Sequence, residues 1–504
     1  MSGPVIMEFY GPPAEAGKTR GAGAEDDNMT KAHAAVRFLA LTAAVCFASS
    51  CIRYHPRPVE PAEAMEDFEA RRLDAPELKD FLLQNQEVKE WPPAAWDLKS
   101  LTLAAFYYHP DLDIARAQWG VARGGRITAG ERINPVLNPL IGYNATTPAS
   151  EVTPWIPEVS LEITVETAGK RGIRIAGARR LEEAARWNIL SVAWEVRSRL
   201  RGALLDAYAT GEKEALLSGG QKLQAEIVRL LGAQKDAGEV SVYDLTQARV
   251  ALDTGRLAAI EAARAKEEAA ARLAAALGLP RRALDGVAIS FDAFRGLDPS
   301  FPAGDVRRHA VLNRSDILAS LSEYAASESA LRLEIAKQFP DIRLGPNYQL
   351  DQTDSKWTIG LAFDLPILNR NKGPIAEAEA RRRESAARFL ALQSQVISEL
   401  DAAVEGCRAA ILKSRAADDL LANLVRQEIA AKARREAGEI SRLELLGVQL
   451  ELNASAQARL EALVQAQEAV GRLENAAQSP LDVKDWITTM PRAGGGSVKE
   501  RKDV

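Results

Sequence analysis

Two long stretches of the chain place apolar residues three or four positions apart, the spacing that lines one face of an α-helix. The first stripe runs through Leu181, Ala185 and Ile189 and predicts a helix over about 175–236. At ~1.5 Å per residue this helix would be about 90 Å long, so it needs a partner along its whole side. A return helix over 241–277 supplies that partner. We therefore expect one helical hairpin over 175–278 and a second, from the same pattern later in the chain, over 375–477.

The residues before each hairpin follow a different pattern. Residues 159–166 alternate strictly between apolar and polar side chains, which is typical of a strand with one apolar and one polar side. Together with the surrounding prolines, such stretches predict four strands, at 135–146, 154–167, 341–350 and 356–366. In the second strand we expect Val159, Leu161, Ile163 and Val165 to face lipid or another apolar surface, and Glu162, Thr164 and Glu166 to face a lumen.

Four strands are too few to close a barrel within one chain, and an isolated two-stranded hairpin is not stable. Their lengths fit strands that cross a membrane in a tilted barrel. We therefore expect several copies of the chain to close one barrel together.

A string of nine residues occurs twice, as AGEVSVYDL at 237–245 and AGEISRLEL at 437–445. Its glycines, Gly238 and Gly438, can take the left-handed conformation that ends a helix. Its serines can then cap the return helix, with a carboxylate three residues further on as in a capping box; these residues are Ser241 with Asp244 and Ser441 with Glu444. Each string therefore predicts a tight tip between two helices. The duplication indicates that the chain consists of two similar halves.

The repeat divides the chain into segments. The N-terminal part comprises a disordered extension (1–28), a signal peptide (29–50) and an extended segment with one short helix (51–100). The first repeat (101–280) and the second (306–478) are joined by a proline-containing linker (281–305). Residues 479–504 are polar and Gly-rich, and we expect them to be disordered.

The segment from Met29 has the features of a secretory signal. Lys31 and Arg37 give a basic start, and a short apolar run ends at Ala48, too short to span a bilayer. Met29 is therefore an alternative start of the chain, with 1–28 upstream of it. The following Ser49-Ser50-Cys51 resembles a bacterial lipobox, which would make Cys51 the lipidated first residue; simple cleavage is the alternative.

Composition adds limits to these expectations. The chain of 504 residues is 47% apolar but only 6% aromatic, because much of the apolar content is Ala, which favours long, closely packed helices. The net charge of −5 gives no electrostatic case for nucleic acid. The three cysteines, Cys46, Cys51 and Cys407, build neither a disulfide framework nor a zinc site. We interpret the four scattered histidines, His33, His55, His109 and His309, as surface residues. No catalytic, cofactor or metal motif is found, so we expect no enzyme.

Two short motifs have competing interpretations. Residues 217–221 read LSGGQ, the signature of ABC-transporter ATPases, but the chain has no P-loop and the string lies within a helical stripe. We interpret its glycines as a local loosening of the helix, since each costs about 1 kcal/mol against Ala. Residues 169–172 read GKRG between a strand and a helix. They could hold an anion, but a junction is favoured because the second half has a related basic turn there.

The order of elements and three strings resemble the TolC-type outer-membrane efflux channels. The strings are the duplicated tip, residues 308–319 (RHAVLNRSDILA) and residues 357–369 (WTIGLAFDLPILN) leading into 375–382. The resemblance covers about 101–477. It implies a mainly α fold with a small membrane β part. In a homotrimer, four strands per chain would form one twelve-stranded barrel, and the helical hairpins would form a hollow periplasmic tunnel that closes at the tips. Residues 165–171 (VETAGKR) resemble the cobalt–zinc–cadmium exporter branch, the CzcC-like proteins.

Within this resemblance the tips become candidates for a gate. Their carboxylates are Glu239 and Asp244 in the first tip and Glu439 and Glu444 in the second. One interpretation is capping, because a carboxylate near a helix N-terminus is stabilising by about 0.3–1 kcal/mol. The other is that rings of carboxylates around the tunnel mouth favour cations. The two are compatible.

The resemblance implies a passive outer-membrane duct of a tripartite efflux pump in a Gram-negative bacterium, exporting small solutes and, in the metal branch, heavy-metal cations. Its partners would be a periplasmic adaptor, an inner-membrane transporter of the RND type and outer-membrane lipid. The alternatives are a periplasmic adaptor and a soluble helical scaffold. The duplicated hairpin and the four strands count against the adaptor.

Overall fold

The computed structural model describes residues 54–85, 90–146, 153–297, 303–352 and 354–480. The chain divides into two compact units, Met1–Met65 and Glu66–Val504. Of the first unit only 54–65 are described, and they enter helix α2 (Pro61–Glu69). The expected extension, the signal peptide with Cys51 and all of the expected tail after Pro480 lie outside the described residues.

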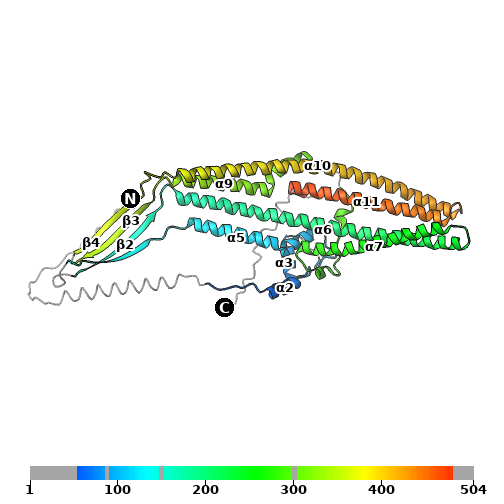
Figure 1. Ribbon diagram of the computed structural model, residues 1–504, viewed down its shortest axis with the longest axis horizontal. Coiled ribbons are helices and arrows are strands. Elements are labelled where there is room, and N and C mark those ends of the chain that lie inside the picture. Colours follow the sequence, from blue (N-terminus) through cyan, green and yellow to red (C-terminus); the bar gives the residue numbers. More distant parts are fainter. Residues whose placement is uncertain (1–53, 86–89, 147–152, 298–302, 353, 481–504) are drawn as a thin grey trace, which may run out of the picture. The chain divides into compact units, whose positions relative to one another are not determined.

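Each half of the large unit contains helices, two strands and a long helical hairpin, in that order (Figure 1). The first half consists of α3 (Pro76–Asn85), α4 (Leu98–Tyr108), α5 (Pro110–Gly130), β1 (Val136–Tyr143), β2 (Trp155–Val165), α6 (Lys170–Asp236) and α7 (Val242–Leu277). Two short 3-10 helices, η1 (Arg281–Leu284) and η2 (Asp292–Phe294), follow. The second half consists of α8 (Ala303–Asn313), α9 (Ser315–Ala336), β3 (Ile342–Asp351), β4 (Asp354–Phe363), α10 (Lys372–Glu436) and α11 (Arg442–Ala477).

The four strands form one antiparallel sheet in the order β1-β2-β3-β4. The register places Leu137 opposite Leu161 and Ile163 opposite Leu344. Among the described residues, β1 and β4 each pair on one side only, so both remain free edges of the sheet.

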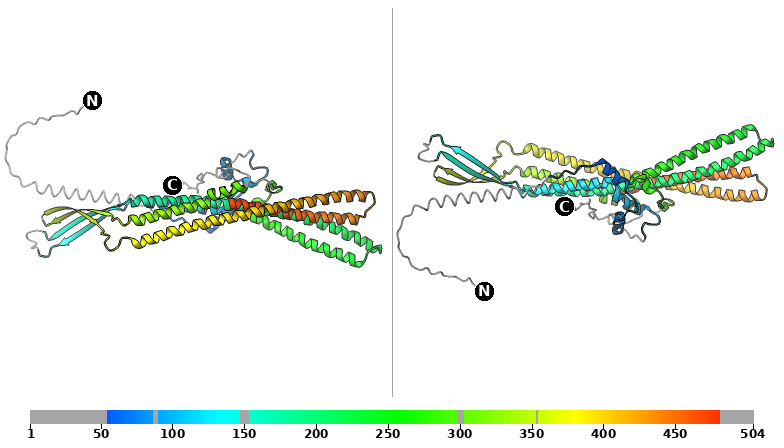
Figure 2. Two further views of the ribbon diagram at one scale, coloured as in Figure 1. Left: turned by 90° about the horizontal axis from the view of Figure 1, so that it is seen from above. Right: turned by 90° about the horizontal axis from the view of Figure 1, so that it is seen from below.

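The helices form two layers that share α6 and α10. Near the strands, α6 packs against α5 and α9, and α9 packs against α10. Toward the tips, α6 packs against α7 and α11, and α11 packs against α10. Figure 2 shows the hairpins α6/α7 and α10/α11 from two further sides. The neighbours therefore run α5-α6-α9-α10 in one layer and α7-α6-α11-α10 in the other, and the expected long hairpins and four antiparallel strands are confirmed.

The largest core lies where the first repeat meets the segment before it. Leu78 and Leu82 of α3, Trp96 and Phe294 are buried in one cluster with α4 and α6. The one short helix expected within 51–100 is present as α2. The expectation that the rest of this segment is extended needs correction, because α3 is a second helix and buries two leucines four positions apart. A second core includes Val396, Leu400 and Cys407 of α10.

His109 is a second correction, because it is only 7% exposed rather than at the surface. It separates α4 from α5 and caps α5, where its Nδ1 accepts a hydrogen bond from the backbone N–H of Asp111 at 3.3 Å. Burial lowers the pKa of His109, so the neutral ring that this acceptor role requires is favoured.

The two repeats are joined by buried charges between α6 and α11. Arg197 Nη1 and Arg201 Nε lie 3.1 and 3.2 Å from the same Glu474 Oε2, and all three side chains are buried. Arg201 also donates to the carbonyl oxygen of Gln467 at 2.9 Å. A Cβ at Gly471 would lie 2.7 Å from Arg201 Nη1, so this glycine makes room for the guanidinium.

Candidate functional site

One face of the sheet is apolar across all four strands. Alternation along each strand and the pairing register place its members on the same side. They are Leu137, Pro139, Ile141 and Tyr143 on β1; Trp155, Pro157, Val159, Leu161, Ile163 and Val165 on β2; Ile342, Leu344, Pro346 and Tyr348 on β3; and Trp357, Ile359, Leu361 and Phe363 on β4. Trp357 is 77% and Ile359 83% exposed. An apolar surface of this extent marks a contact with membrane or protein.

The opposite face is mixed and mostly polar. Glu158, Ser160 and Glu162 of β2 lie there, and Asn347 of β3 donates a hydrogen bond to Glu158 at 3.0 Å. Its apolar exceptions include Val136, Leu140 and Ile156. The lipid-facing and lumen-facing assignment of β2 stays a prediction. Within the strand the two side-chain sets do lie on opposite faces, whereas Glu166 follows its end at Val165.

Aromatic side chains end the apolar face at the loop side of the strands. Tyr143 and Trp155 have ring centroids 4.9 Å apart, and Tyr348 and Trp357 4.7 Å apart. Phe363 lies at the other end of β4. At ~3.4 Å per residue, the face extends about 20 Å along β4 from Trp357 to Phe363. Tyr and Trp are enriched where strands meet a membrane interface. These aromatics were not among the expected site residues, although Trp357, Ile359 and Leu361 alternate with smaller or polar residues as clearly as the apolar residues of β2 do.

The strand-to-helix junctions are held by residues with positive φ. Gly169 has φ +68° before α6, and Asn371 has φ +57° before α10. Lys170 is buried, and its Nζ donates to Asp341 Oδ1 at 2.7 Å and to the carbonyl oxygen of Phe339 at 2.5 Å. Asn371 Nδ2 donates to the carbonyl oxygen of Glu334 at 2.7 Å. The lysine of the GKRG string is thus paired within the protein, which favours a structural junction over an anion site.

The two tips have the same backbone geometry. Gly238 and Gly438 have φ +80° and +78°, and each lies in a pair of hydrogen bonds that closes the preceding helix. In the first tip Gly238 N donates to Lys235 O at 3.0 Å and Glu239 N to Gln234 O at 2.9 Å. In the second tip Gly438 N donates to Arg435 O at 3.1 Å and Glu439 N to Arg434 O at 2.9 Å.

The caps of the return helices differ in one bond. Ser241 and Ser441 both accept from the backbone N–H three residues on, at 3.1 Å. Glu444 completes a capping box by accepting from the backbone N–H of Ser441 at 2.7 Å. Asp244 is one methylene shorter, and its carboxylate accepts instead from the hydroxyl of Ser241 at 2.6 Å.

The two tip glutamates also differ. Glu439 Oε2 lies 3.2 Å from Arg434 Nε. Within the described part of the chain, Glu239 has no comparable ion pair. The tip residues of each string thus lie together, and the first tip carries the less compensated negative charge.

The LSGGQ string lies within a continuous helix α6. A Cβ at Gly220 would lie 3.1 Å from Asn453 Oδ1, and Asn453 Nδ2 donates to the carbonyl oxygen of Leu216 at 2.9 Å. Gly220 therefore allows α11 to approach α6 closely, and the expected local loosening of the helix stays a prediction.

Neither a membrane helix nor a metal cluster is found in the part of the chain that the structure describes. No described helix is both long and apolar enough to cross a membrane. No group of three or more His, Cys, Asp or Glu among the described residues could hold a metal ion.

Solved structures share this arrangement. The outer membrane protein VceC of Vibrio cholerae superposes with a TM-score of 0.62 at 18% identity, covering 76% of this chain and 97% of that chain. CusC, for which conformational changes accompany folding and transmembrane channel formation, superposes with a TM-score of 0.61 at 17% identity, covering 84% of this chain and 98% of that chain. The chain has the TolC-type outer-membrane channel fold. That fold contains both the sheet and the paired hairpins described above.

No protein-family model matches the chain. The chain is 24% identical over 283 residues to the cobalt-zinc-cadmium resistance protein CzcC of Cupriavidus metallidurans. The matched region is 56% of this chain and 65% of that protein, less than two thirds of its length.

Proposed function

We propose that this protein is the outer-membrane channel of a tripartite efflux pump and acts as a passive duct without catalysing a reaction. The observation that carries the proposal is the apolar sheet face, with Trp357 and Ile359 more than three quarters exposed, beside two long helical hairpins. A soluble scaffold would leave this face in water, which soluble proteins avoid. A bilayer core covers it.

The free edges support a homotrimer. The sheet ends at β1 and β4, the layer near the strands ends at α5 and α10, and the layer near the tips ends at α7 and α10. Exposed apolar side chains lie on these end helices, including Val121 on α5, Leu257 on α7 and Leu412 on α10. Head-to-tail contacts of this kind build a closed ring when the rotation between copies closes, and an open filament when it does not. Three copies would give the twelve-stranded barrel and the tunnel that the sequence resemblance implies.

In this proposal the sheet lies in the outer membrane of a Gram-negative bacterium and the hairpins extend into the periplasm. The tips would form the gate and would meet a periplasmic adaptor, which connects to an inner-membrane transporter of the RND type. The eight gate residues are Gly238, Glu239, Ser241 and Asp244 with Gly438, Glu439, Ser441 and Glu444.

A matched pair of strand variants tests the membrane assignment. Ile359→Arg places a charge on the apolar face, whereas Thr358→Arg places it on the opposite face. An Arg facing lipid at mid-depth costs about 2–4 kcal/mol. We expect Ile359→Arg to reduce the trimer in outer-membrane fractions and the channel conductance in planar bilayers, with Thr358→Arg close to the parent. Equal effects of the two variants would contradict the barrel assignment.

We propose heavy-metal cations as the cargo, supported by the similarity to the cobalt-zinc-cadmium resistance protein. Deletion of the gene should lower resistance to cobalt, zinc and cadmium, and the parent gene should restore it. Unchanged metal resistance together with lost drug resistance would place the cargo in another class.

We also propose that Cys51 is acylated and anchors the mature chain. Cys51→Ser should abolish labelling by a radioactive fatty acid. Labelling that persists in this variant would exclude the lipobox.

A further inference from the structure

The loop from β4 to α10 exposes three large apolar side chains beyond the end of the sheet. The corresponding connection in the first half, 166–169, has four residues, whereas this loop, 364–371, has eight. Its apolar residues are Leu365, Ile367 and Leu368, which are 65%, 72% and 100% exposed. Pro366 restricts the backbone, and Ile367 N donates to Leu365 O at 2.8 Å. We call residues 365–368 the knob.

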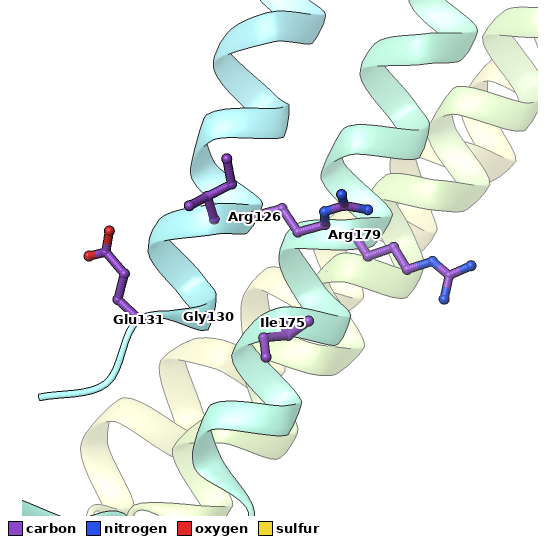
Figure 3. A pocket seen from close by; sticks show the side chains of 6 residues that line it. Arg126, Gly130, Glu131, Ile175 and Arg179 are labelled. Atoms are coloured by element: carbon purple, nitrogen blue, oxygen red, sulfur yellow. The ribbon is translucent and has the colours of Figure 1, made fainter.

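A hollow of about 530 Å³ lies near the start of the edge strand β1, where α5 ends beside the start of α6. Its lining is Arg126, Ile127, Gly130, Glu131, Ile175 and Arg179 (Figure 3). Ile127 is 63% exposed. A Cβ at Gly130 would lie 3.9 Å from Ile175 Cδ1, an ordinary contact distance, so a longer side chain at this position would occupy part of the hollow. We call this hollow the socket.

The free edges of the sheet would bring a knob and a socket together between two copies. Register pairs Val136 with Glu162 and Ile342 with Phe363, so β1 begins and β4 ends at the same end of the sheet. Pairing β4 with β1 of the next copy continues the antiparallel order. With the apolar faces of both copies on the same side, it places Phe363 of one copy near Leu137, at the start of β1 of the next. The knob begins two positions after Phe363, and the socket residue Glu131 precedes Val136 by only five positions.

We propose that the knob of each copy fills the socket of the next copy and latches the seam between them. This inference rests on the homotrimer of the proposed function. The knob is apolar, and Ile127, Gly130 and Ile175 give the socket an apolar floor. The socket rim carries Arg126, which forms an ion pair with Glu182 at 3.1 Å, and Glu131. A bilayer core excludes such a charged rim, so a protein segment fits the socket better than a lipid chain.

Cysteine pairs test the latch in the assembled protein. In outer membranes, Ile127→Cys with Leu368→Cys should give covalent dimers and trimers on mild oxidation, because a disulfide needs Cα atoms within ~7 Å. The matched control is Val121→Cys with Leu368→Cys. Val121 is also exposed on α5, but it lies six residues from Ile127, or about 9 Å along the helix. We expect several-fold more covalent product from the first pair, and equal yields would overturn the latch.

Trimer size in mild detergent, measured without oxidation, separates this inference from the proposed function. A trimer that forms but gives no covalent product from the first pair overturns the latch and leaves the channel proposal standing. A chain that remains monomeric in the membrane overturns both.

A second variant fills the socket without using cysteine. Gly130→Leu should displace the knob and lower the temperature at which the trimer dissociates. The control Gly124→Leu adds the same side chain to α5, where a Cβ meets nothing within 4 Å. A dissociation temperature that is the same for both variants would contradict the latch.

Discussion

The turn after α6 and the turn after α10 share one string and one set of backbone hydrogen bonds, yet the helices that leave them are packed differently. On α7 a stripe of large apolar side chains is exposed, with Tyr243, Val250 and Leu257 seven residues apart. On α11, which is described throughout, no large apolar side chain is exposed. It lies between α6 and α10, and Glu474 joins it to α6 through two buried arginines. A repeated local sequence therefore builds the same turn twice, while neighbours decide whether the hairpin is fixed within the chain or offers an edge to another copy.

The largest effect is expected from removing the buried ion pairs that join α11 to α6. Glu474→Ala takes one carboxylate from Arg197 and Arg201, both less than 10% exposed. Removing one member of a buried charge pair costs about 3–5 kcal/mol, so thermal unfolding in detergent should begin at a markedly lower temperature. Glu468→Ala, on the exposed side of α11, is the control and should change stability by less than about 1 kcal/mol. Equal shifts would mean that the buried cluster does not fix α11.

The second test acts on what the two tips share. Replacing Gly238 and Gly438 together by Val forces a β-branched residue to positive φ, at about 1–2 kcal/mol each. We expect normal trimer levels in the outer membrane but lost efflux, since only the tips should open or refold. Trimer abundance and cargo resistance measure the two outcomes. Gly232→Val on α6, where a Cβ meets nothing within 4 Å, is the control. Normal export by the double variant would make the tips simple connectors.

A third test exchanges the capping residues. Asp244→Glu supplies the methylene that the first cap lacks and should add the reciprocal bond seen at Glu444, while Glu444→Asp should remove it. Bonds of this kind contribute up to about 1 kcal/mol. Hydrogen exchange at the first turns of α7 and α11 should slow in the first variant and accelerate in the second. Unchanged exchange in both would show that the reciprocal bond is irrelevant to tip stability.

The smallest expected effect concerns the tip charges. Glu239→Gln should lower the preference for cations in bilayer recordings more than Glu439→Gln does, because Arg434 already compensates Glu439. Both effects should weaken at high salt through screening. Assembly should be normal in both, which trimer abundance checks. An equal loss of preference in the two variants would remove the proposed electrostatic difference between the tips.

The hairpins, the strands and the tips could be predicted because their signals are local. Alternation along 159–166 and the repeated string at 237 and 437 each specify a structure within about ten residues. The contacts that the sequence did not reveal join distant residues. Arg197 meets Glu474 across 277 positions, and Gly220 matters because Asn453 of another helix packs on it. His109 directly follows the nearly unbroken apolar run of α4, which is typical of a buried helix, but the scatter of the four histidines along the chain suggested a surface position. The role of the tips as a gate remains a prediction.

Helix α10 extends without interruption through both layers, from Lys372 to Glu436. In the proposed trimer it would form one entire side of every seam, whereas α5 and α7 would divide the other side between them. A rotation of α10 about its long axis would therefore change the contacts near the membrane and the contacts near the tips at the same time. In that trimer, a partner that rotated α10 at the tips would also change the contacts between copies at the end of the sheet.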